Sequence, residues 1–258
     1  MADGPDPSGG RAPGGEGHAR WVRLSHWIIT LSVLTLAFTG FEILMVHPRL
    51  YWGKTGNDLT PALLELPISR NYRHGGYGKP EPLTANASGP VSASRTYDIF
   101  NQNGWGRSLH FLAAWFLVLP GLLYVLLGLL SGHFRSHLWP RLRELSPRLV
   151  WRDLAAHLRS RFPAPSGGPG PTYGLLQKCS YCFVVFVAAP LLVATGLTMS
   201  PTVTAAVPGL LDLFGGQQSA RTIHFFASAA LVLFVIVHVV MVIRSGFRRQ
   251  IRAMTVGR

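Results

Sequence analysis

The residues with the clearest chemistry are two histidines in one apolar stretch near the end of the chain. Between Arg221 and Arg244 there is no charged residue, and the stretch contains His224 and His238. It is long enough to cross a bilayer as a helix, which needs roughly 20 apolar residues. Fourteen helical residues rise about 21 Å through nearly four turns, so both imidazoles share one face, one near each membrane surface. Imidazole is an axial ligand of haem iron, so from this helix alone the spacing fits two stacked haems and two interhelical hydrogen bonds equally well.

The composition supports a membrane protein. Of the 258 residues, 48% are hydrophobic and only 14% are charged, whereas a soluble domain carries about 25% charged residues. The formal charge is +13, but the arginines gather beside the ends of apolar runs. That distribution fits membrane orientation and anionic lipid better than a nucleic-acid partner. The two cysteines do not make a disulfide framework.

Four apolar runs predict an all-α fold, an integral membrane four-helix transmembrane bundle with a long outer loop after the first helix. We expect the spanning helices at about 24–46, 108–130, 173–199 and 222–243. Around them we expect a disordered tail (1–19), an outer loop (47–104), an inner basic segment (131–172) and a basic tail (251–258); the membrane domain covers 20–250. Within the inner segment, Ser146-Pro147 should begin a short amphipathic helix on the membrane surface. In the third helix, Pro190 should introduce a kink.

The distribution of positive charge sets the orientation. The chain up to Arg23, residues 131–178 and the chain from Arg244 onward hold 3, 8 and 5 Lys and Arg residues, which is 16 of the 24, and the two outer segments hold 7 and 1. The positive-inside rule then places both termini in the cytoplasm. At this orientation His26 and His238 lie at the inner side of the membrane, and His110 and His224 lie at the outer side.

The chain also carries an internal repeat. The second and fourth apolar runs align at an offset of 114, where Arg107-Ser-Leu-His110-Phe111 matches Arg221-Thr-Ile-His224-Phe225. The first and third runs share a Thr-Gly ending, at Thr39-Gly40 and Thr195-Gly196. The repeat has diverged, because Tyr124 stands at the place of His238 and Cys182 at the place of His26. These matches predict two copies of a helical hairpin.

An arginine precedes a histidine by three residues in three places, at Arg23, Arg107 and Arg221. Residues three apart share a helix face, so each arginine lies one turn nearer the water than its histidine. A deep imidazole with a shallow guanidinium suits a haem whose propionates point outward. The alternative is an arginine that anchors the helix end by reaching toward the surface.

These residues resemble a known family, the four-helix b-type cytochrome subunits of bacterial membrane oxidoreductases. Examples are the formate dehydrogenase gamma subunit, the cytochrome b of Ni-Fe hydrogenases and the thiosulfate reductase cytochrome b. The resemblance is carried by His26, His110, and His224 with His238 fourteen residues later. The Pro190…Thr195-Gly196-Leu197…Met199-Ser200-Pro201 pattern is also similar. The resemblance to the family covers residues of about 21–46 and 105–250.

The resemblance implies two haem b groups, with His26 and His238 on the inner iron and His110 and His224 on the outer iron. It also implies a quinone near the inner haem and a bacterial plasma membrane location. The loop over 47–104 is longer than in some relatives. We expect it to be a docking surface for an extracytoplasmic redox subunit such as a molybdopterin oxidoreductase, or else a cover over a cofactor. The substrate chemistry would belong to that partner.

Two other functions stay open from the sequence. One is a transporter or sensor whose intramembrane histidines carry protons or metal, and the other is a plain membrane anchor. Further candidate residues are expected to have no ligand role: His133, His137, Cys179, Cys182, Glu42 and Asp212. The cysteines are expected to be packing residues, and the histidines and carboxylates to be solvated near the membrane surfaces.

Overall fold

The computed structural model describes residues 20–57, 60–68, 103–132, 134, 139–140, 146–158 and 175–257. Within them, four helical segments are long and apolar enough to cross a membrane: Arg20–Val46, Gly104–Leu130, Leu175–Thr198 and Gln217–Arg244. The predicted all-α architecture with four spans is therefore confirmed, and each span begins and ends within about five residues of its expected bounds. The expected tail over 1–19 and much of the expected outer loop and inner segment lie outside the described residues.

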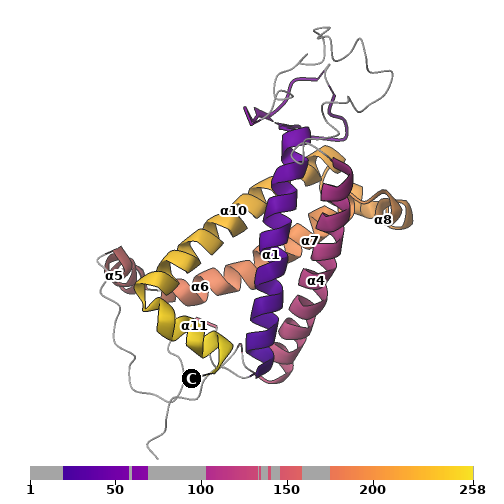
Figure 1. Ribbon diagram of the computed structural model, residues 1–258. Coiled ribbons are helices and arrows are strands. Elements are labelled where there is room, and N and C mark those ends of the chain that lie inside the picture. Colours follow the sequence, from indigo (N-terminus) through magenta and orange to yellow (C-terminus); the bar gives the residue numbers. More distant parts are fainter. Residues whose placement is uncertain are drawn as a thin grey trace, which may run out of the picture.

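The spans form two hairpins. Helix α1 (Arg20–Val46) packs along α4 (Asn103–Leu130), and α10 (Gln217–Arg244) packs along the third span. The third span consists of α6 (Leu175–Phe183), a π-helical segment (Val184–Ala188) and α7 (Ala189–Thr198). Figure 1 shows the second hairpin running obliquely to α1 and α4. The duplicated hairpin in the sequence thus corresponds to two packed helix pairs.

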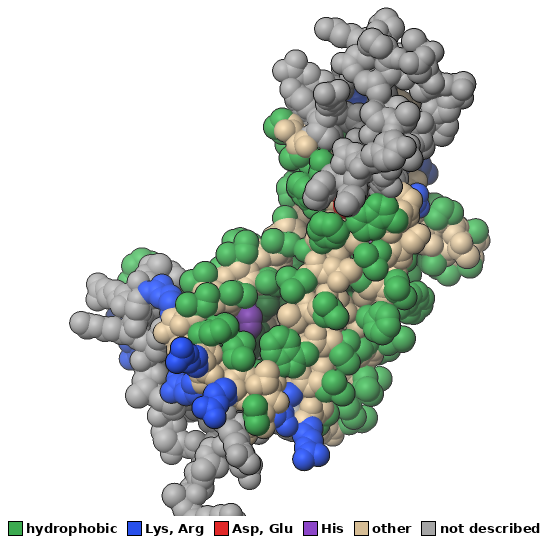
Figure 2. All heavy atoms as spheres, in the orientation of Figure 1, with side chains coloured by type: hydrophobic (Ala, Val, Ile, Leu, Met, Phe, Trp, Pro, Cys, Tyr) green, Lys and Arg blue, Asp and Glu red, His purple; other side chains and the backbone are tan. Residues whose placement is uncertain are grey.

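The buried residues of the spans are mostly small, alanine beside serine and threonine, whereas many of the large apolar side chains face outward. The buried polar residues of the spans are Ser32, Thr39, Glu42, Thr195, Thr198, Ser219 and Thr222. Leucine, phenylalanine and valine side chains cover the outside, as Figure 2 shows in green. Because lipid is as apolar as leucine, helices in membranes associate through small residues and polar contacts rather than through a hydrophobic core.

The third span is irregular directly before Pro190, where a kink was expected. A π-helical turn ends at Ala188, and Pro190 lies at the start of the α-helical part that follows. Proline lacks an N–H group and its ring clashes with the carbonyl four residues earlier in an α-helix. The wider turn just before Pro190 relaxes that conflict within the span.

The described part of the outer loop is fastened to the beginning of α10. Strand β1 (Arg49–Leu50) pairs antiparallel with β2 (Leu64–Glu65). The Gly53 carbonyl accepts hydrogen bonds from the N–H groups of Gln218 (3.1 Å) and Ser219 (3.2 Å). The Gly53 N–H donates to Ser219 Oγ at 2.7 Å, and Thr222 Oγ1 donates to the Tyr51 carbonyl at 2.6 Å. The first turn of a helix has N–H groups without intrahelical partners, so this loop acts as its cap.

Short helices flank the spans on both sides. At one end of the spans, α8 (Pro201–Ala206) and α9 (Gly209–Leu213) join α7 to α10. At the other end, beside the beginning of α6, α5 (Pro147–Leu158) is the short helix that Ser146-Pro147 predicted. The segment expected as a basic tail is helical up to Thr255, within α11 (Phe247–Thr255). Trp27 Nε1 donates to the Met254 carbonyl at 3.0 Å, and Arg23 donates to the Thr255 carbonyl at 2.9 Å, so α11 lies against the beginning of α1.

We predict that Gly216→Ala destabilises the protein. Gly216 precedes α10 with φ at +119°, and a Cβ there would lie 2.5 Å from the Gly53 carbonyl oxygen. A side chain in such a conformation costs about 1–3 kcal/mol before any clash, so the midpoint of thermal unfolding in detergent should fall. Gly209→Ala is the control, because a Cβ at Gly209 meets nothing within 4 Å. Equal midpoints for the two variants would contradict the prediction.

We also predict that Trp27→Phe loosens α11. The change keeps the aromatic ring and removes one neutral hydrogen bond, which contributes about 0.5–1.5 kcal/mol. Amide hydrogen exchange over 247–255 should therefore become about two- to tenfold faster, as measured by mass spectrometry. Trp21→Phe, which alters a ring packed on Tyr124 at 5.8 Å, should leave that exchange unchanged. An unchanged rate in the Trp27 variant would show that the hydrogen bond does not hold α11.

Candidate functional site

The four histidines expected at two depths meet in two pairs. His26 of α1 faces His238 of α10, with ring centroids 6.5 Å apart and planes at 52°. His110 of α4 faces His224 of α10, with ring centroids 6.3 Å apart and planes at 60°. Each pair joins one histidine from each hairpin. Helix α10 therefore contributes one ring to each site. The structure brings together the same histidine partners that were expected from their depth in the membrane.

The ring separations suit a single metal atom between two imidazoles. Two directly hydrogen-bonded imidazoles would have centroids about 5 Å apart, from one N···N distance of about 2.9 Å plus about 1.1 Å per ring. Two metal–nitrogen bonds of about 2.0–2.1 Å each give roughly 6.3 Å instead. The observed 6.3 and 6.5 Å agree with the second arrangement. The donor set of two neutral nitrogens per site also fits an iron porphyrin, which leaves two axial positions to the protein.

The Thr-Gly endings of the sequence repeat lie beside the outer pair. Thr39 Oγ1 is 2.9 Å from His110 Nδ1, and Thr195 Oγ1 is 3.0 Å from His224 Nδ1. The glycine that follows each threonine also faces the same ring. A Cβ at Gly40 would lie 3.6 Å from His110 Cε1, and one at Gly196 would lie 3.5 Å from His224 Cε1. The repeated Thr-Gly pair therefore packs against the histidines of the outer site, a role that the sequence did not indicate.

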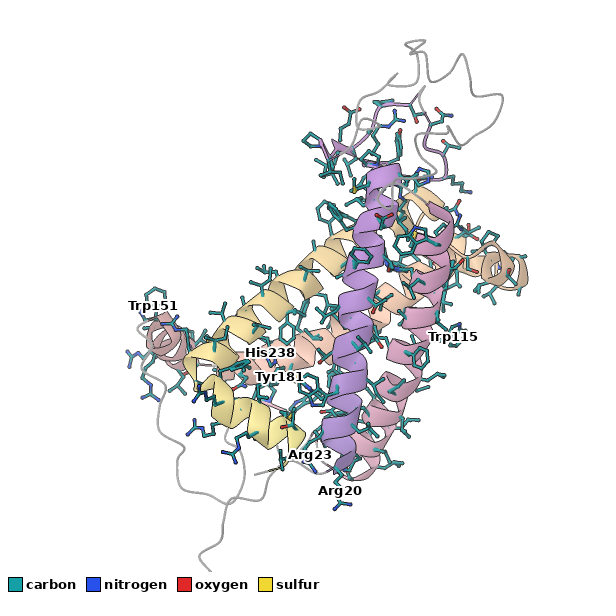
Figure 3. All side chains as sticks on the ribbon, in the orientation of Figure 1. Arg20, Arg23, Trp115, Trp151, Tyr181 and His238 are labelled. Carbon is teal, nitrogen blue, oxygen red and sulfur yellow. The ribbon has the colours of Figure 1, made fainter. Side chains whose placement is uncertain are left out.

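The inner pair has aromatic neighbours. The Phe234 ring stacks on His238 with centroids 5.9 Å apart, and Trp27 meets His26 edge-on at 5.4 Å. Tyr181 lies 6.4 Å from His238, and its hydroxyl is hydrogen-bonded to Gln177 Nε2 at 3.0 Å. Figure 3 labels Tyr181 and His238 side by side. At that place Figure 2 shows a histidine in a hollow bordered by hydrophobic side chains, so this site is open toward one face of the protein.

Tyr181 reaches the inner site because of the π-helical segment. His26 lies 13 residues before Thr39, and the residue 13 before Thr195 is Cys182. A π turn takes up one extra residue, so the residue in the corresponding place is 14 before Thr195, which is Tyr181. The gapless alignment that set Cys182 opposite His26 was therefore wrong by one position.

The three predicted arginines have different surroundings. Arg221 donates to the His47 carbonyl, and Arg23 donates to the Thr255 carbonyl while its Nε is buried without a hydrogen-bond partner among the described residues. Arg107 is exposed at the beginning of α4. Because a guanidinium has five N–H donors, the first two could still bind an anionic group. A buried Nε without a partner is a feature that a propionate would satisfy.

A fourth arginine, Arg49, was not singled out from the sequence. It is 9% exposed, and its charge acts repulsively on Arg221, one turn outside His224. Two neighbouring guanidiniums at low exposure favour an anion beside the outer pair. The sequence shows Arg49 only as one of several cations in a long loop, and nothing there predicts that the loop folds back onto α10.

The residues set aside from the sequence have mixed outcomes. Glu42 was expected to be solvated, but it is 0% exposed, and its Cβ lies near Gly106 of α4. Asp212 is exposed, as expected, and Cys179 and Cys182 are of intermediate exposure and are not joined in a disulfide. His133 and His137 lie outside the described residues. Within the described part of the chain, no group of three or more His, Cys, Asp or Glu residues could hold a metal ion.

Comparisons with known proteins agree with this geometry. Residues 17–257 match the family described as prokaryotic cytochrome b561. The chain is also 27% identical over 225 residues to a protein of Azospira oryzae named "Putative protein-methionine-sulfoxide reductase subunit YedZ1", a match covering 87% of this chain and 89% of that protein. No solved structure matches the chain. With four spans and a family match over nearly its whole length, the chain belongs to the prokaryotic cytochrome b561 family and is a multi-pass bacterial membrane cytochrome that binds haem b.

Proposed function

We propose that this chain is a di-haem cytochrome b subunit that carries electrons across the membrane between the quinone pool and an extracytoplasmic redox partner. The observation that carries the proposal is the pair of histidine sites, each spaced for one metal atom and each built from both hairpins. Along α10 the two sites are separated by about 21 Å, from 14 helical residues. Two sites in series at that separation suit electron transfer from one membrane surface toward the other.

In this proposal the four histidines would be the protein's ligands to the two haem irons. His26 and His238 hold the inner haem, and His110 and His224 hold the outer one. Arg23 at the inner site and Arg221 at the outer site neutralise propionates, which their positions near the membrane surfaces and their remaining N–H donors support. Arg107 is proposed for the same role from its spacing to His110. When bound, haem iron supplies one-electron chemistry, and the chain supplies position and electrostatics.

The name of the relative supports a proposal for the partner and for the direction of electron flow. Its printed name makes YedZ1 a subunit of a protein-methionine-sulfoxide reductase. A reductase partner for this chain needs electrons, so we propose that a quinol is oxidised near His238 and that electrons move outward. Oxidation of one quinol to quinone releases two electrons and two protons; reduction of one sulfoxide to a sulfide and water consumes two of each. The partner, expected to be molybdopterin-dependent, docks on the outer loop over 47–104.

The proposed orientation has both termini in the cytoplasm. The exposed arginines of α11 are Arg248, Arg249 and Arg252, and those with described side chains on α5 are Arg148 and Arg152. Figure 2 shows Lys and Arg gathered at the end of the molecule where α11 lies. Cytoplasmic segments next to membrane spans carry an excess of such residues, which supports this orientation.

Replacement of each histidine should remove one haem. The wild-type protein should carry two haem b per chain by pyridine haemochrome assay, with six-coordinate low-spin spectra. Each of His26→Ala, His238→Ala, His110→Ala and His224→Ala should lower the count to about one, because a site with one imidazole left binds iron far more weakly. His47→Ala, an exposed histidine in the loop, should keep both.

The same variants test the direction of electron entry. A reduced quinol added to purified protein should reduce the remaining haem rapidly in His110→Ala and slowly in His26→Ala. A colourless wild-type protein after expression with ample haem would refute the proposal. Retention of two haems in all four variants would assign the histidines a different role, such as proton or metal transfer.

The orientation is tested with reporters. Green fluorescent protein fused after the last residue should fluoresce, and alkaline phosphatase at the same place should be inactive, because phosphatase matures only outside the cytoplasm. Phosphatase inserted after Asn57, in the outer loop, should be active. The opposite pattern of activities would reverse the proposed topology and exchange the inner and outer sites.

A further inference from the structure

Each of the two outer histidines contacts a buried threonine of the helix packed beside it. His110 Nδ1 lies 2.9 Å from Thr39 Oγ1 across the first hairpin, and His224 Nδ1 lies 3.0 Å from Thr195 Oγ1 across the second. Both threonines are 0% exposed. The contact thus occurs twice, with the same atoms, in hairpins that pack separately. At the inner site, His238 lies against the rings of Phe234 and Tyr181 instead.

The direction of these hydrogen bonds can be assigned from the other partner of each hydroxyl. Thr39 Oγ1 donates to the Thr35 carbonyl at 2.8 Å, and Thr195 Oγ1 donates to the Leu191 carbonyl at 2.6 Å. A hydroxyl has only one proton, and a carbonyl oxygen can only accept. Each threonine oxygen must therefore accept from the imidazole. The proton of each ring then sits on Nδ1, which leaves the Nε2 lone pair to bind a metal.

We propose that Thr39 and Thr195 are positioning residues for the outer haem. They hold His110 and His224 in the Nδ1–H tautomer, fix the rings about their side-chain torsions, and make Nε2 a stronger donor. The inference rests on the proposed function, since it assumes iron between these two rings. A hydrogen bond from the distal ring nitrogen raises the basicity of a ligating histidine. A more basic ligand stabilises ferric over ferrous iron, so the threonines lower the reduction potential of the outer site.

The experiment replaces each threonine by valine, which keeps the shape and removes the acceptor. Partners of this kind typically change metal affinity by 10–100-fold. For Thr39→Val and Thr195→Val we expect the ferric-to-ferrous ratio of the outer haem to fall by about tenfold at a fixed potential, a shift of about +59 mV for one electron. Potentials are measured by spectroelectrochemical titration in a His26→Ala background, where only the outer haem remains.

Two kinds of control separate positioning from general packing. Thr39→Ser and Thr195→Ser keep a hydroxyl and should restore the wild-type potential. Thr198→Val removes a threonine that is 1% exposed and that donates to the Ala194 carbonyl at 2.8 Å, in the same helix as Thr195. The Thr198→Val variant loses a hydrogen bond to a backbone carbonyl but no contact with a histidine, so the reduction potential of the outer haem should stay unchanged. Thr35→Val is the equivalent control in α1.

Each outcome decides the proposal. A potential that shifts in the valine variants alone, or loss of the outer haem in them while the serine and Thr198 variants retain it, supports it. Unshifted potentials, equal shifts in valine and serine variants, or an equal shift in Thr198→Val would overturn it while leaving the proposed function intact. A wild-type protein without haem would refute the proposed function first, and this inference with it.

Discussion

Polar side chains inside a bilayer must find partners within the protein, and this constraint determines how the two hairpins meet. Each hairpin alone would leave imidazoles facing hydrocarbon. When the hairpins pack, the imidazoles face one another at two depths, 6.3 and 6.5 Å apart. The threonines behind the outer rings and the aromatic side chains beside the inner rings complete these surroundings. The buried residues of the spans are mostly alanine, serine and threonine, and the exposed surface of the spans is rich in leucine, as suits contact with lipid.

The duplicated hairpin has been preserved at one end and altered at the other. At the outer end both copies contribute a histidine from the second helix and a threonine from the first, so the site is nearly symmetric. At the inner end one copy contributes His26 from its first helix and the other contributes His238 from its second. Tyr124 and Tyr181 occupy the two places that lack a histidine, and the Tyr124 ring packs on Trp21 at 5.8 Å. The inner site is therefore less constrained by the repeat.

The parts of the fold that could be predicted are those governed by local patterns. Run length and charge located the spans, and helical periodicity placed the four histidines at two depths, because both effects depend on residues close in sequence. Pro190 indicated an irregularity in the third span, but not that the chain would accommodate it as a π-helical turn, because a kink satisfies the same local constraint. The burial of Glu42 and Arg49 and the packing of α11 against Trp27 also could not be predicted, because they depend on contacts between residues far apart in the sequence.

Helix α10 contributes a ring to both sites, and this places a strict limit on its length. One residue inserted or deleted between His224 and His238 would turn one imidazole by about 100° and move it by about 1.5 Å. Neither site could then keep its partner without loss at the other, whereas any apolar side chain would serve at most of the thirteen positions between them. The third span contributes no histidine to either pair, and it is the span that carries the extra residue of a π turn. Substitutions between His224 and His238 should therefore be tolerated far better than insertions or deletions there.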